Sequence, residues 1–510
     1  MSEQQYDVIV VGSGGGALTG AAVAARAGLS VVVVEKTALI GGTSAYSGGA
    51  CWLPGSQVQQ RAGLPDSTEG ARAYLAAIMA DADEPATRAK VEAFLAHAPE
   101  LGADLETDPD VDFEWLPFPE YYDAPGRVPM GRSIQPTSIK RDALPFLVAD
   151  RVRPPVELDR AGAPGRRTLT GGQALIARLA TVLLREGGTM LTGHEVVGLL
   201  TDDTGRVTGV RCTTADGEVT IGAARGVLVA AGGFEGDAAL RAEHGVPGEV
   251  AWSMAPRGAN TGTAMTAARA LGAATDFSAL GWFCPGLAQP DGGGSFTLGF
   301  RSGVMLDRSG RRYANESLPY DRFGREMAAH AGAVPSWFVF DSREGGRLPG
   351  IAMPEGDPEA HLAAGTWVRA DSLDELAAAI GLPADALTAS VGRFNGFCAT
   401  GVDDDFGRGT DEYDTFFTGG DGSNKALTPV DVPPYYAARF VLSDLGTKGG
   451  LVTDPAARVL RADGSPIHGL YAAGNSTASL FGPVYPGPGA PLGSAMVFAS
   501  LAVRDLISAG

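Results

Sequence analysis

A glycine-rich turn near the N-terminus constrains the fold of this chain more than any other feature. The turn, Gly12-Ser-Gly-Gly-Gly-Ala17, follows the β-branched run 6–11, which predicts a buried strand. The helix-length segment 18–27 comes next, and the apolar run 29–35 predicts a second buried strand. A strand, turn, helix and strand within about 30 residues form the right-handed crossover unit of a parallel sheet. We therefore expect an α/β fold with a Rossmann-like domain.

The spacing Gly12-x-Gly14-x-x-Ala17 predicts a site for the pyrophosphate of a dinucleotide. The first glycine makes the tight turn, the second lets the backbone approach the pyrophosphate, and the third small residue lets helix and strand pack closely. The helix N-terminus adds N–H groups and a partial positive charge. Glu35 ends the second strand, where a carboxylate takes ribose hydroxyls in such sites.

Three further glycine-rich segments favour FAD over NAD. The loop Gly41-Gly-Thr-Ser44 closely follows Glu35, where flavoproteins thread the ribityl phosphate. The segment 469–475 resembles the second FAD motif, with Asn475 where Asp is usual, and the run 226–233 resembles the strand beside that motif. No His lies in or beside the Gly41 loop, so we expect noncovalent FAD. The residues expected to hold it are Gly12, Ser13, Gly14, Gly15, Ala17, Glu35, Lys36, Gly42, Thr43, Ser44, Ser47, Gly48, Gly49, Val196, Ala231, Gly232, Gly474, Asn475, Gly489 and Leu492.

The pattern of the chain changes near residue 277 and returns near residue 438. Between these points the predicted strands are shorter, and Pro and Gly are scattered. The sequence therefore predicts a discontinuous FAD-binding domain, 1–276 and 438–510, with an inserted α+β catalytic domain, 277–437. Further expected elements are a β-meander at 190–221, a strand at 226–233, and helices at 83–101, 171–186, 373–399 and 491–509.

Composition and charge exclude several classes of partner. The formal charge is −19 and the pI is near 4.8, whereas nucleic-acid binding needs a basic face. We find no apolar run of the ~18 residues that a transmembrane segment needs, and no signal-peptide pattern at the N-terminus. The four cysteines lie far apart and no His pair has metal spacing, so we expect reduced thiols and no metal site. A cytoplasmic location is expected, with peripheral membrane contact left open.

Tyrosine, rather than histidine, is the residue type predicted to carry the chemistry. None of the six histidines lies in a glycine-rich cofactor loop or an aromatic cluster, and no GxSxG elbow is present. Tyrosines stand in three clusters, FPEYY at 118–122, NESLPYD at 315–321 and VYPGPG at 484–489. Each cluster alone is more typical of an aromatic side chain packed beside a proline turn.

With these clusters the sequence resembles the flavin-dependent 3-ketosteroid Δ1-dehydrogenases, or 3-oxosteroid 1-dehydrogenases. The matching stretches extend from the first strand to the terminal helix. The resemblance implies the succinate dehydrogenase/fumarate reductase type of flavoprotein fold, within the glutathione-reductase-like superfamily. The matching stretches are GSGGGALTGA (12–21), EKTALIGGTSAYSGG (35–49), WLPGSQVQQRAGLPDST (52–68), NESLPYDRFG (315–324), LSDLGTKGGLVTD (442–454) and YPGPGAPLGSAMVF (485–498).

The resemblance also implies roles for individual residues. Tyr320 would take a proton from C2 of the steroid A-ring, assisted by Tyr121 through a hydrogen bond. Tyr485 and the backbone N–H of Gly489 would bind the C3 oxygen. A hydride would pass from C1 to flavin N5, and an external acceptor, quinone or dye-like, would reoxidise the flavin. These residues come from different parts of the chain, so we expect the site between the two domains.

Three alternatives remain open from the sequence. A 3-ketosteroid Δ4-(5α)-dehydrogenase would desaturate the same ring at another bond, but in our reading it lacks the NESLPY base. A fumarate reductase-like enzyme needs Arg and His groups around two carboxylates, and the arginines of the inserted segment lack companion histidines. A flavoprotein that only transfers electrons would use the tyrosines for packing.

Overall fold

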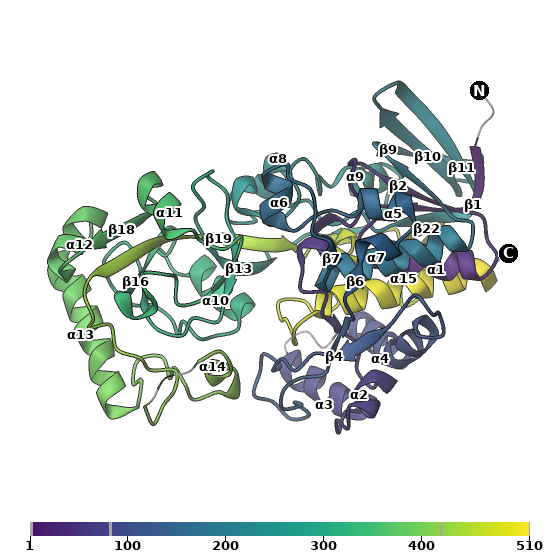
Figure 1. The fold of residues 1–510 in the computed structure, drawn as a ribbon. Coiled ribbons are helices and arrows are strands. Elements are labelled where there is room, and N and C mark those ends of the chain that lie inside the picture. The colour runs from purple at the N-terminus through teal and green to yellow at the C-terminus, as the bar shows by residue number, and fades with distance from the viewer. Residues whose placement is uncertain (1–3, 81–83, 419, 421, 509–510) are drawn as a thin grey trace. The chain divides into compact units, whose positions relative to one another are not determined.

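The computed structural model describes residues 4–80, 84–418, 420 and 422–508 (Figure 1). The chain divides into two compact units. Unit 1 comprises Met1–Gly245, Ala255–Leu280 and Thr447–Gly510, and unit 2 comprises Val246–Met254 and Gly281–Gly446. The sequence-based boundaries, 277 and 437, differ from these because they ignored the short piece 246–254 and ended the insertion inside a strand that continues to Thr447.

Unit 1 is built on an eight-stranded sheet with the order β21-β22-β11-β1-β2-β8, to which β10 and β9 are added through β11. The neighbours from β22 to β8 pair in parallel, with Val11 opposite both Val34 and Val229. The carboxyl ends of β1, β2 and β11 therefore meet at one edge, where ligands bind in such sheets. The strands are β1 (Gln4–Val11), β2 (Val31–Glu35), β8 (Thr189–Thr192), β9 (Glu195–Thr201), β10 (Val207–Thr214), β11 (Gly217–Val229), β21 (Arg458–Leu460) and β22 (Pro466–Ala472).

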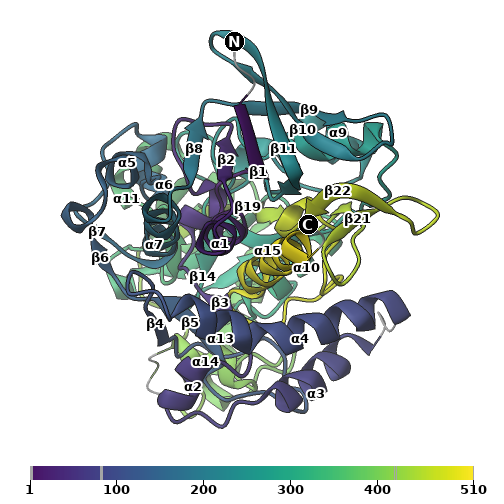
Figure 2. The ribbon, with the colours of Figure 1, turned by 90° about the vertical axis from the view of Figure 1, so that its right-hand side faces the viewer.

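Helix α1 (Gly15–Arg26) packs against α15 (Ala490–Ser508) and α7 (Gly171–Arg185), and Figure 2 shows α1 and α15 side by side. The close approach requires glycine, because a Cβ on Gly16 would lie 2.9 Å from the backbone oxygen of Ala495. The remaining helices of unit 1 are α2 (Gln57–Arg61), α3 (Thr68–Ile78), α4 (Pro85–Leu105), α5 (Phe146–Arg151), α6 (Val156–Arg160), α8 (Ala238–Glu243) and α9 (Thr263–Ala270). Its short strands are β3 (Cys51–Trp52), β4 (Phe113–Trp115), β5 (Ser133–Pro136), β6 (Ile139–Lys140), β7 (Thr168–Leu169), β12 (Thr275–Asp276) and β20 (Gly450–Leu451).

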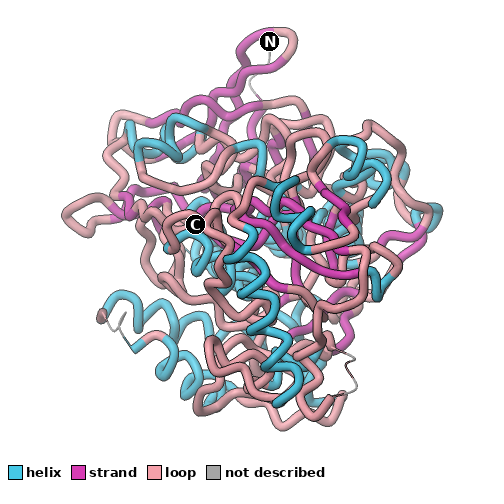
Figure 3. The backbone as a smooth tube through the Cα atoms, turned by 90° about the vertical axis from the view of Figure 1, so that its left-hand side faces the viewer, coloured by secondary structure: helices cyan, strands magenta, loops and turns pink. Residues whose placement is uncertain are grey.

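Unit 2 has a five-stranded sheet whose central strand, β19 (Tyr435–Thr447), pairs with β13, β16 and β18. Figure 3 shows long loops, coloured pink, between the helices and strands of the protein. An apolar core between this sheet and two helices includes Leu306, Val339, Leu376, Leu387 and Phe394. The other strands are β13 (Gly281–Leu287), β14 (Phe296–Leu298), β15 (Val304–Leu306), β16 (Ser336–Asp341), β17 (Ile351–Met353) and β18 (Trp367–Ala370). The helices are α10 (Tyr320–Ala329), α11 (Pro358–Ala364), α12 (Leu373–Ile380), α13 (Ala384–Thr400) and α14 (Glu412–Phe416).

Two predicted elements differ from the structure. The segment 373–399 forms two helices, because Gly381 ends α12 in the left-handed conformation and Pro383 precedes α13. The segment 226–233 holds the end of β11 rather than a separate strand, since the last meander strand continues to Val229. The predicted meander itself is present as β9, β10 and β11. The predicted helix ends Asp83 and Ala509 lie outside the described residues.

Helix α15 has the length and the overall apolar composition of a membrane helix, although Arg504 and Asp505 interrupt its apolar run. Within the described residues it is the one helix that meets both criteria. Two thirds of its most apolar window, 67%, is buried inside the protein, as in the core helices of other proteins. This burial follows from its position against α1, α4 and β3.

Candidate active site

A hollow lies at the edge of the unit 1 sheet where β1, β2 and β11 end. Nine of the residues predicted to bind a dinucleotide line it, and the other predicted cofactor residues do not. The nine are Gly12, Ser13, Gly14, Glu35, Lys36, Gly42, Val196, Ala231 and Gly232. Lining residues that sequence reasoning missed are His194, Glu195, Ala259, Asn260, Thr261, Gly262, Thr263, Ala264, Met265 and Ser476, together with flanking residues of the strand ends.

The first glycine turn has the geometry that its spacing predicted. Gly12 has a φ of +100°, and a Cβ there would lie 2.5 Å from the carbonyl oxygen of Ala230. Gly14 is the N-cap of α1, and the N–H of Gly15 donates to Ser44 Oγ at 3.1 Å. A Cβ on Gly15 would collide with Leu492 of α15 at 2.4 Å. The turn is therefore fixed by neighbours on three sides and leaves the N-terminus of α1 beside the hollow.

Glu35 joins the two glycine loops. Ser13 Oγ donates to Glu35 Oε2 at 2.5 Å, and the N–H of Gly41 donates to Ser13 Oγ at 2.9 Å. The other carboxylate oxygen accepts from the backbone N–H and hydroxyl of Thr37 at 2.8 and 2.9 Å. Since an ionised carboxylate offers about four acceptor positions and three are used, Glu35 keeps capacity for one ribose hydroxyl.

A second polar group lies at the same hollow. Lys36 Nζ lies 3.0 Å from Glu195 Oε1 and donates to Thr261 Oγ1 at 2.9 Å. Thr263 Oγ1 donates to the same carboxylate oxygen at 3.0 Å. Glu195 and Thr261 stand more than 150 residues after the glycine turn, and no spacing signal connects them to it.

The second glycine loop is held against the start of α7. It forms a 3-10 turn, Gly42–Tyr46, and the N–H of Gly172 donates to the carbonyl of Ser47 at 2.9 Å. A Cβ on Gly49 would lie 2.4 Å from the backbone of Gly171. Asn260 Nδ2 donates to Thr43 Oγ1 at 3.1 Å, which connects this loop to the lining of the hollow.

These features fit FAD. The hollow offers a side-chain-free turn, a helix N-terminus for phosphate oxygens and a carboxylate for ribose hydroxyls, which are the parts that a flavin dinucleotide needs. Among the described residues, no group of three or more His, Cys, Asp or Glu side chains is placed to hold a metal ion.

Two of the predicted catalytic tyrosines lie together in unit 1. The ring centroids of Tyr121 and Tyr485 are 5.1 Å apart with an interplanar angle of 63°, and both side chains are at least 97% buried. The backbone connects them as well, because the N–H of Tyr121 donates to the carbonyl of Pro486 at 3.1 Å.

The loop from Tyr485 to Gly489 is held from several sides. Ser133 Oγ donates to the carbonyl of Pro488 at 2.5 Å, and the N–H of Trp52 donates to the carbonyl of Gly489 at 3.2 Å. Gly489 has a φ of +80°, and a Cβ there would lie 2.1 Å from the carbonyl of Ala50. None of the described residues accepts a hydrogen bond from the Gly489 N–H. This donor stands directly before α15, where the helix dipole favours a negative charge.

A buried ion pair lies directly before Tyr121. Arg132 Nε donates to Glu120 Oε1 at 2.6 Å, and both side chains are fully buried. Trp52 Nε1 and the N–H of Val128 also donate to this carboxylate, each at 2.9 Å. Burial raises the pKa of Glu120, and Arg132 acts against that rise. The pair fixes the backbone that carries Tyr121.

Tyr320 lies in unit 2 as the first residue of α10. Its ring meets Phe296 edge-on, with centroids 4.7 Å apart, and its side chain is 6% exposed. Helix α10 packs closely on β13, since a Cβ on Gly324 would lie 2.6 Å from the N of Cys284. The packing of this helix therefore fixes the position of the Tyr320 backbone within unit 2.

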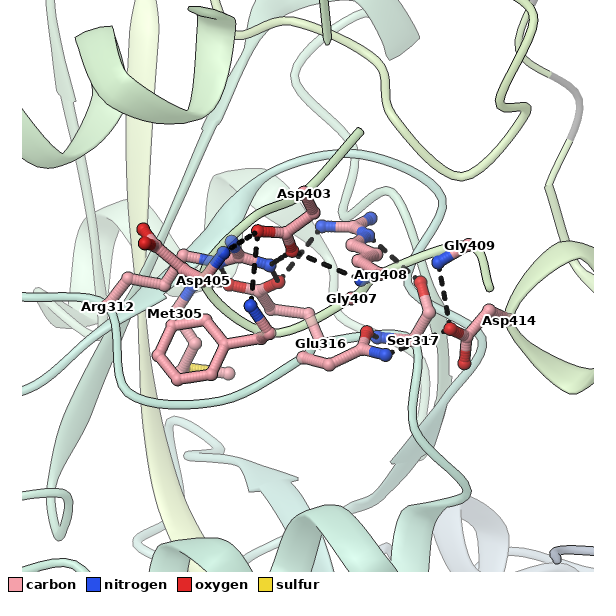
Figure 4. A network of polar contacts seen from close by, with 12 residues as sticks. Met305, Arg312, Glu316, Ser317, Asp403, Asp405, Gly407, Arg408, Gly409 and Asp414 are labelled. Atoms are coloured by element: carbon pink, nitrogen blue, oxygen red, sulfur yellow. Dashed lines mark hydrogen bonds and ion pairs between the residues drawn. The ribbon is translucent and has the colours of Figure 1, made fainter. Parts of the chain in front are cut away.

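The residues before Tyr320 belong to a buried charged network (Figure 4). Glu316 accepts from Arg312 at 2.8 Å and from Arg408 at 3.1 Å, and Arg408 Nη1 donates to the carbonyl of Gly303 at 2.8 Å. Asp403 accepts from Arg312 Nη2 at 2.8 Å. The Asn-Glu-Ser part of the motif thus holds the loop that leads into α10.

Comparison with known proteins identifies the class first. A family model described as an FAD binding domain matches residues 7–492, so the protein is an FAD-binding flavoprotein. The 3-oxosteroid 1-dehydrogenase of Rhodococcus opacus is 42% identical, with 98% of each chain covered. A crystal structure of the Sterolibacterium denitrificans 3-ketosteroid Δ1-dehydrogenase with 1,4-androstadiene-3,17-dione is 30% identical, with a TM-score of 0.90 and 99% of this chain and 100% of that chain covered.

The chain belongs to the FAD-binding 3-oxosteroid 1-dehydrogenase family. The predicted cofactor and the predicted fold class, that of the succinate dehydrogenase/fumarate reductase flavoproteins, are confirmed. The protein is an FAD-dependent oxidoreductase acting on CH–CH groups. The 4-oxocyclohexanecarboxylate 2-dehydrogenase of Sinomonas cyclohexanicum is also 37% identical, over 98% of this chain and 92% of that protein.

Proposed function

We propose that the protein introduces a C1–C2 double bond into the A-ring of a 3-oxosteroid. The observation that carries the proposal is the Tyr121–Tyr485 ring contact, together with the buried hydrogen bonds that hold the loop carrying both Tyr485 and Gly489. The 42% identity to the Rhodococcus opacus enzyme over almost the whole chain supports it.

Tyr485 and the Gly489 N–H bind the C3 carbonyl oxygen in this proposal. A C–H next to a ketone becomes acidic only when the enolate oxygen that develops is stabilised. A phenol and a backbone N–H form a two-donor site for that oxygen, and loss of one such donor typically costs about 2.7–4 kcal/mol. The buried contacts of the loop preorganise both donors before the substrate binds.

Tyr320 removes the C2 proton to its phenolic oxygen. A tyrosine has a reference pKa of about 10, so tyrosinate needs help at neutral pH. A hydrogen bond donated to this oxygen favours the charged form, and the resemblance to the family assigns the assisting role to Tyr121. Bound FAD supplies the acceptor for the hydride that leaves C1. An external oxidant, a quinone or a dye, takes the two electrons to complete the cycle.

A second substrate class has support from one comparison. The Sinomonas cyclohexanicum relative carries the name of a 4-oxocyclohexanecarboxylate dehydrogenase, so its substrate is also a ring ketone. The same enolate chemistry would serve either substrate. A carboxylate substrate would in addition need a cation beside the ring, because a buried unpaired charge is costly.

The experiment measures turnover of the purified holoenzyme with an artificial electron acceptor. The two substrates are 4-androstene-3,17-dione and 4-oxocyclohexanecarboxylate, compared at equal concentrations. The proposal predicts that the steroid has the higher kcat/KM, by at least about tenfold, and yields the 1,4-diene. Preference for the carboxylate, or a steroid product unsaturated elsewhere, would contradict it. Acid precipitation of the same sample should release the flavin, as noncovalent binding requires.

A further inference from the structure

Tyr74 bridges two segments that carry proposed catalytic groups. It lies on α3, its side chain is fully buried, and its hydroxyl donates to the carbonyl of Pro486 at 2.7 Å. The N–H of Tyr122 donates to the same hydroxyl at 3.2 Å. The Tyr121 N–H donates to the Pro486 carbonyl as well, so the Tyr74 hydroxyl and this backbone bond together connect the two segments.

The position of Tyr74 is itself fixed. The Arg132 guanidinium lies over its ring at 5.7 Å from the centroid, and a Cβ on Gly126 would lie 2.9 Å from the Tyr74 nitrogen. Burial raises the pKa of Tyr74 far above its ordinary value, so the hydroxyl stays protonated and can donate at any working pH. The phenol therefore keeps the same donor and acceptor roles throughout the range in which the enzyme is assayed.

We infer that Tyr74 is a positioning residue for the C3-oxygen site. Its hydroxyl holds the backbone of Tyr121–Tyr122 in register with the loop Tyr485–Gly489, and it does not touch the reacting atoms. The inference rests on the proposed function, which assigns the C3 oxygen to Tyr485 and Gly489. A shift of about 1 Å in such groups lowers a rate about 100-fold, so two hydrogen bonds at the junction are sufficient to affect the rate.

The test compares Tyr74→Phe with a matched control, Tyr471→Phe. Both changes remove the phenol oxygen of a buried tyrosine in unit 1 and keep the ring. The Tyr471 hydroxyl donates to Asp505 at 2.7 Å, and Tyr471 is not among the residues that line the hollow. We expect kcat for 4-androstene-3,17-dione to fall about 10- to 100-fold in Tyr74→Phe and less than about 3-fold in the control.

Comparing the effect on kcat with the effect on product binding distinguishes a positioning role of Tyr74 from a purely structural one. In Tyr74→Phe the Kd for 1,4-androstadiene-3,17-dione, measured by the change in flavin absorbance, should stay within about 3-fold of wild type, because preorganisation acts mainly on the transition state. A parallel loss of product binding and kcat, equal losses in both variants, or an unchanged kcat in Tyr74→Phe would overturn the inference.

Hydrogen exchange tests Tyr74 independently of the proposed substrate. In wild type the Tyr122 amide should be protected, and peptides covering 481–489 should exchange faster in Tyr74→Phe than in Tyr471→Phe. An unprotected Tyr122 amide in wild type overturns the inference whether or not the variant folds. If no 3-oxosteroid is turned over but these exchange results hold, the proposed function fails and the connection through Tyr74 stands.

Discussion

Tyr121 and Tyr485 stand 364 residues apart in the chain, and their ring centroids lie 5.1 Å apart in the interior of unit 1. The contact is supported by a hydrogen bond from the Tyr121 N–H to the carbonyl of the residue after Tyr485. Rings and backbone are thus fixed together, so each phenol has a defined position relative to the Gly489 N–H. Such preorganisation is what an oxyanion-binding site requires.

The glycine turn permits a matched pair of substitutions. Gly12 and Gly28 both have positive φ, at +100° and +81°, but only a Cβ at position 12 meets other atoms. Gly28→Ala should cost about 1–2 kcal/mol of stability and keep the flavin. Gly12→Ala should cost more and yield protein without FAD. The flavin-to-protein absorbance ratio and urea unfolding measure both effects, and equal flavin content in the two variants would contradict this account of the turn.

Glu35 should determine FAD affinity through its charge. Glu35→Gln replaces a carboxylate oxygen by an N–H donor, which removes a charge-assisted acceptor worth about 1.5–3 kcal/mol. We expect the Kd for FAD, measured by titration of apoprotein, to rise about 10- to 100-fold. Glu218→Gln on the exposed part of β11 is the control and should leave the Kd unchanged. An unaltered Kd in Glu35→Gln would show that the carboxylate serves only Ser13 and Thr37.

Asp403 should stabilise unit 2 in a pH-dependent way. Burial alone would raise the pKa of Asp403, but the hydrogen bond and charge of Arg312 outweigh it and the pKa is lowered. The stabilisation is therefore complete above the pKa of Asp403 in the unfolded chain, near 3.8. It is lost as the pH falls through the lowered pKa of Asp403 in the folded protein. Asp403→Asn should cost about 3 kcal/mol at pH 7, measured by urea unfolding.

The pH series provides the control for that substitution. The difference in free energy of unfolding between wild type and Asp403→Asn should stay constant from pH 7 to pH 5. It should narrow only below about pH 4. The exposed variant Asp216→Asn should show no such difference. If this difference in free energy of unfolding already narrows between pH 7 and pH 5, a group other than Asp403 causes the pH dependence.

A tyrosine base predicts an alkaline rise in rate. If Tyr320 must be deprotonated, kcat/KM should climb about tenfold per pH unit until the pH reaches its pKa, since free tyrosine titrates near pH 10. The measurement uses initial rates with an acceptor whose own reactivity is constant over the range. A flat profile from about pH 6 to pH 10 would argue against tyrosinate as the base.

Much of the cofactor site could be predicted because its signal is local. The turn at Gly12, the carboxylate of Glu35 and the loop at Gly42 are close in sequence, and the crossover unit has a fixed geometry. Glu195, Asn260 and Thr261 could not be predicted in the same way. They reach the hollow through pairing of distant strands and the loop before α9, and no periodicity encodes that placement.

Packing also decided what sequence patterns left ambiguous. The apolar composition of α15 is equally typical of a membrane helix and a core helix, and only its burial against α1 and α4 separates them. The role of Tyr74 had no local signal, since its partner carbonyl belongs to Pro486, more than 400 residues away. The tyrosine motifs, in contrast, were identified by resemblance, because spacing alone does not separate catalysis from packing.

The most direct test of the proposed activity is anaerobic mixing of the flavoprotein with 4-androstene-3,17-dione while flavin absorbance is recorded. Wild type should bleach rapidly and form the 1,4-diene. Tyr320→Phe should bind the steroid, but its flavin should bleach at least about 100-fold more slowly, as expected for loss of a general base. Bound flavin that no 3-oxosteroid bleaches would contradict the account, and equal bleaching by Tyr320→Phe would contradict the assigned base.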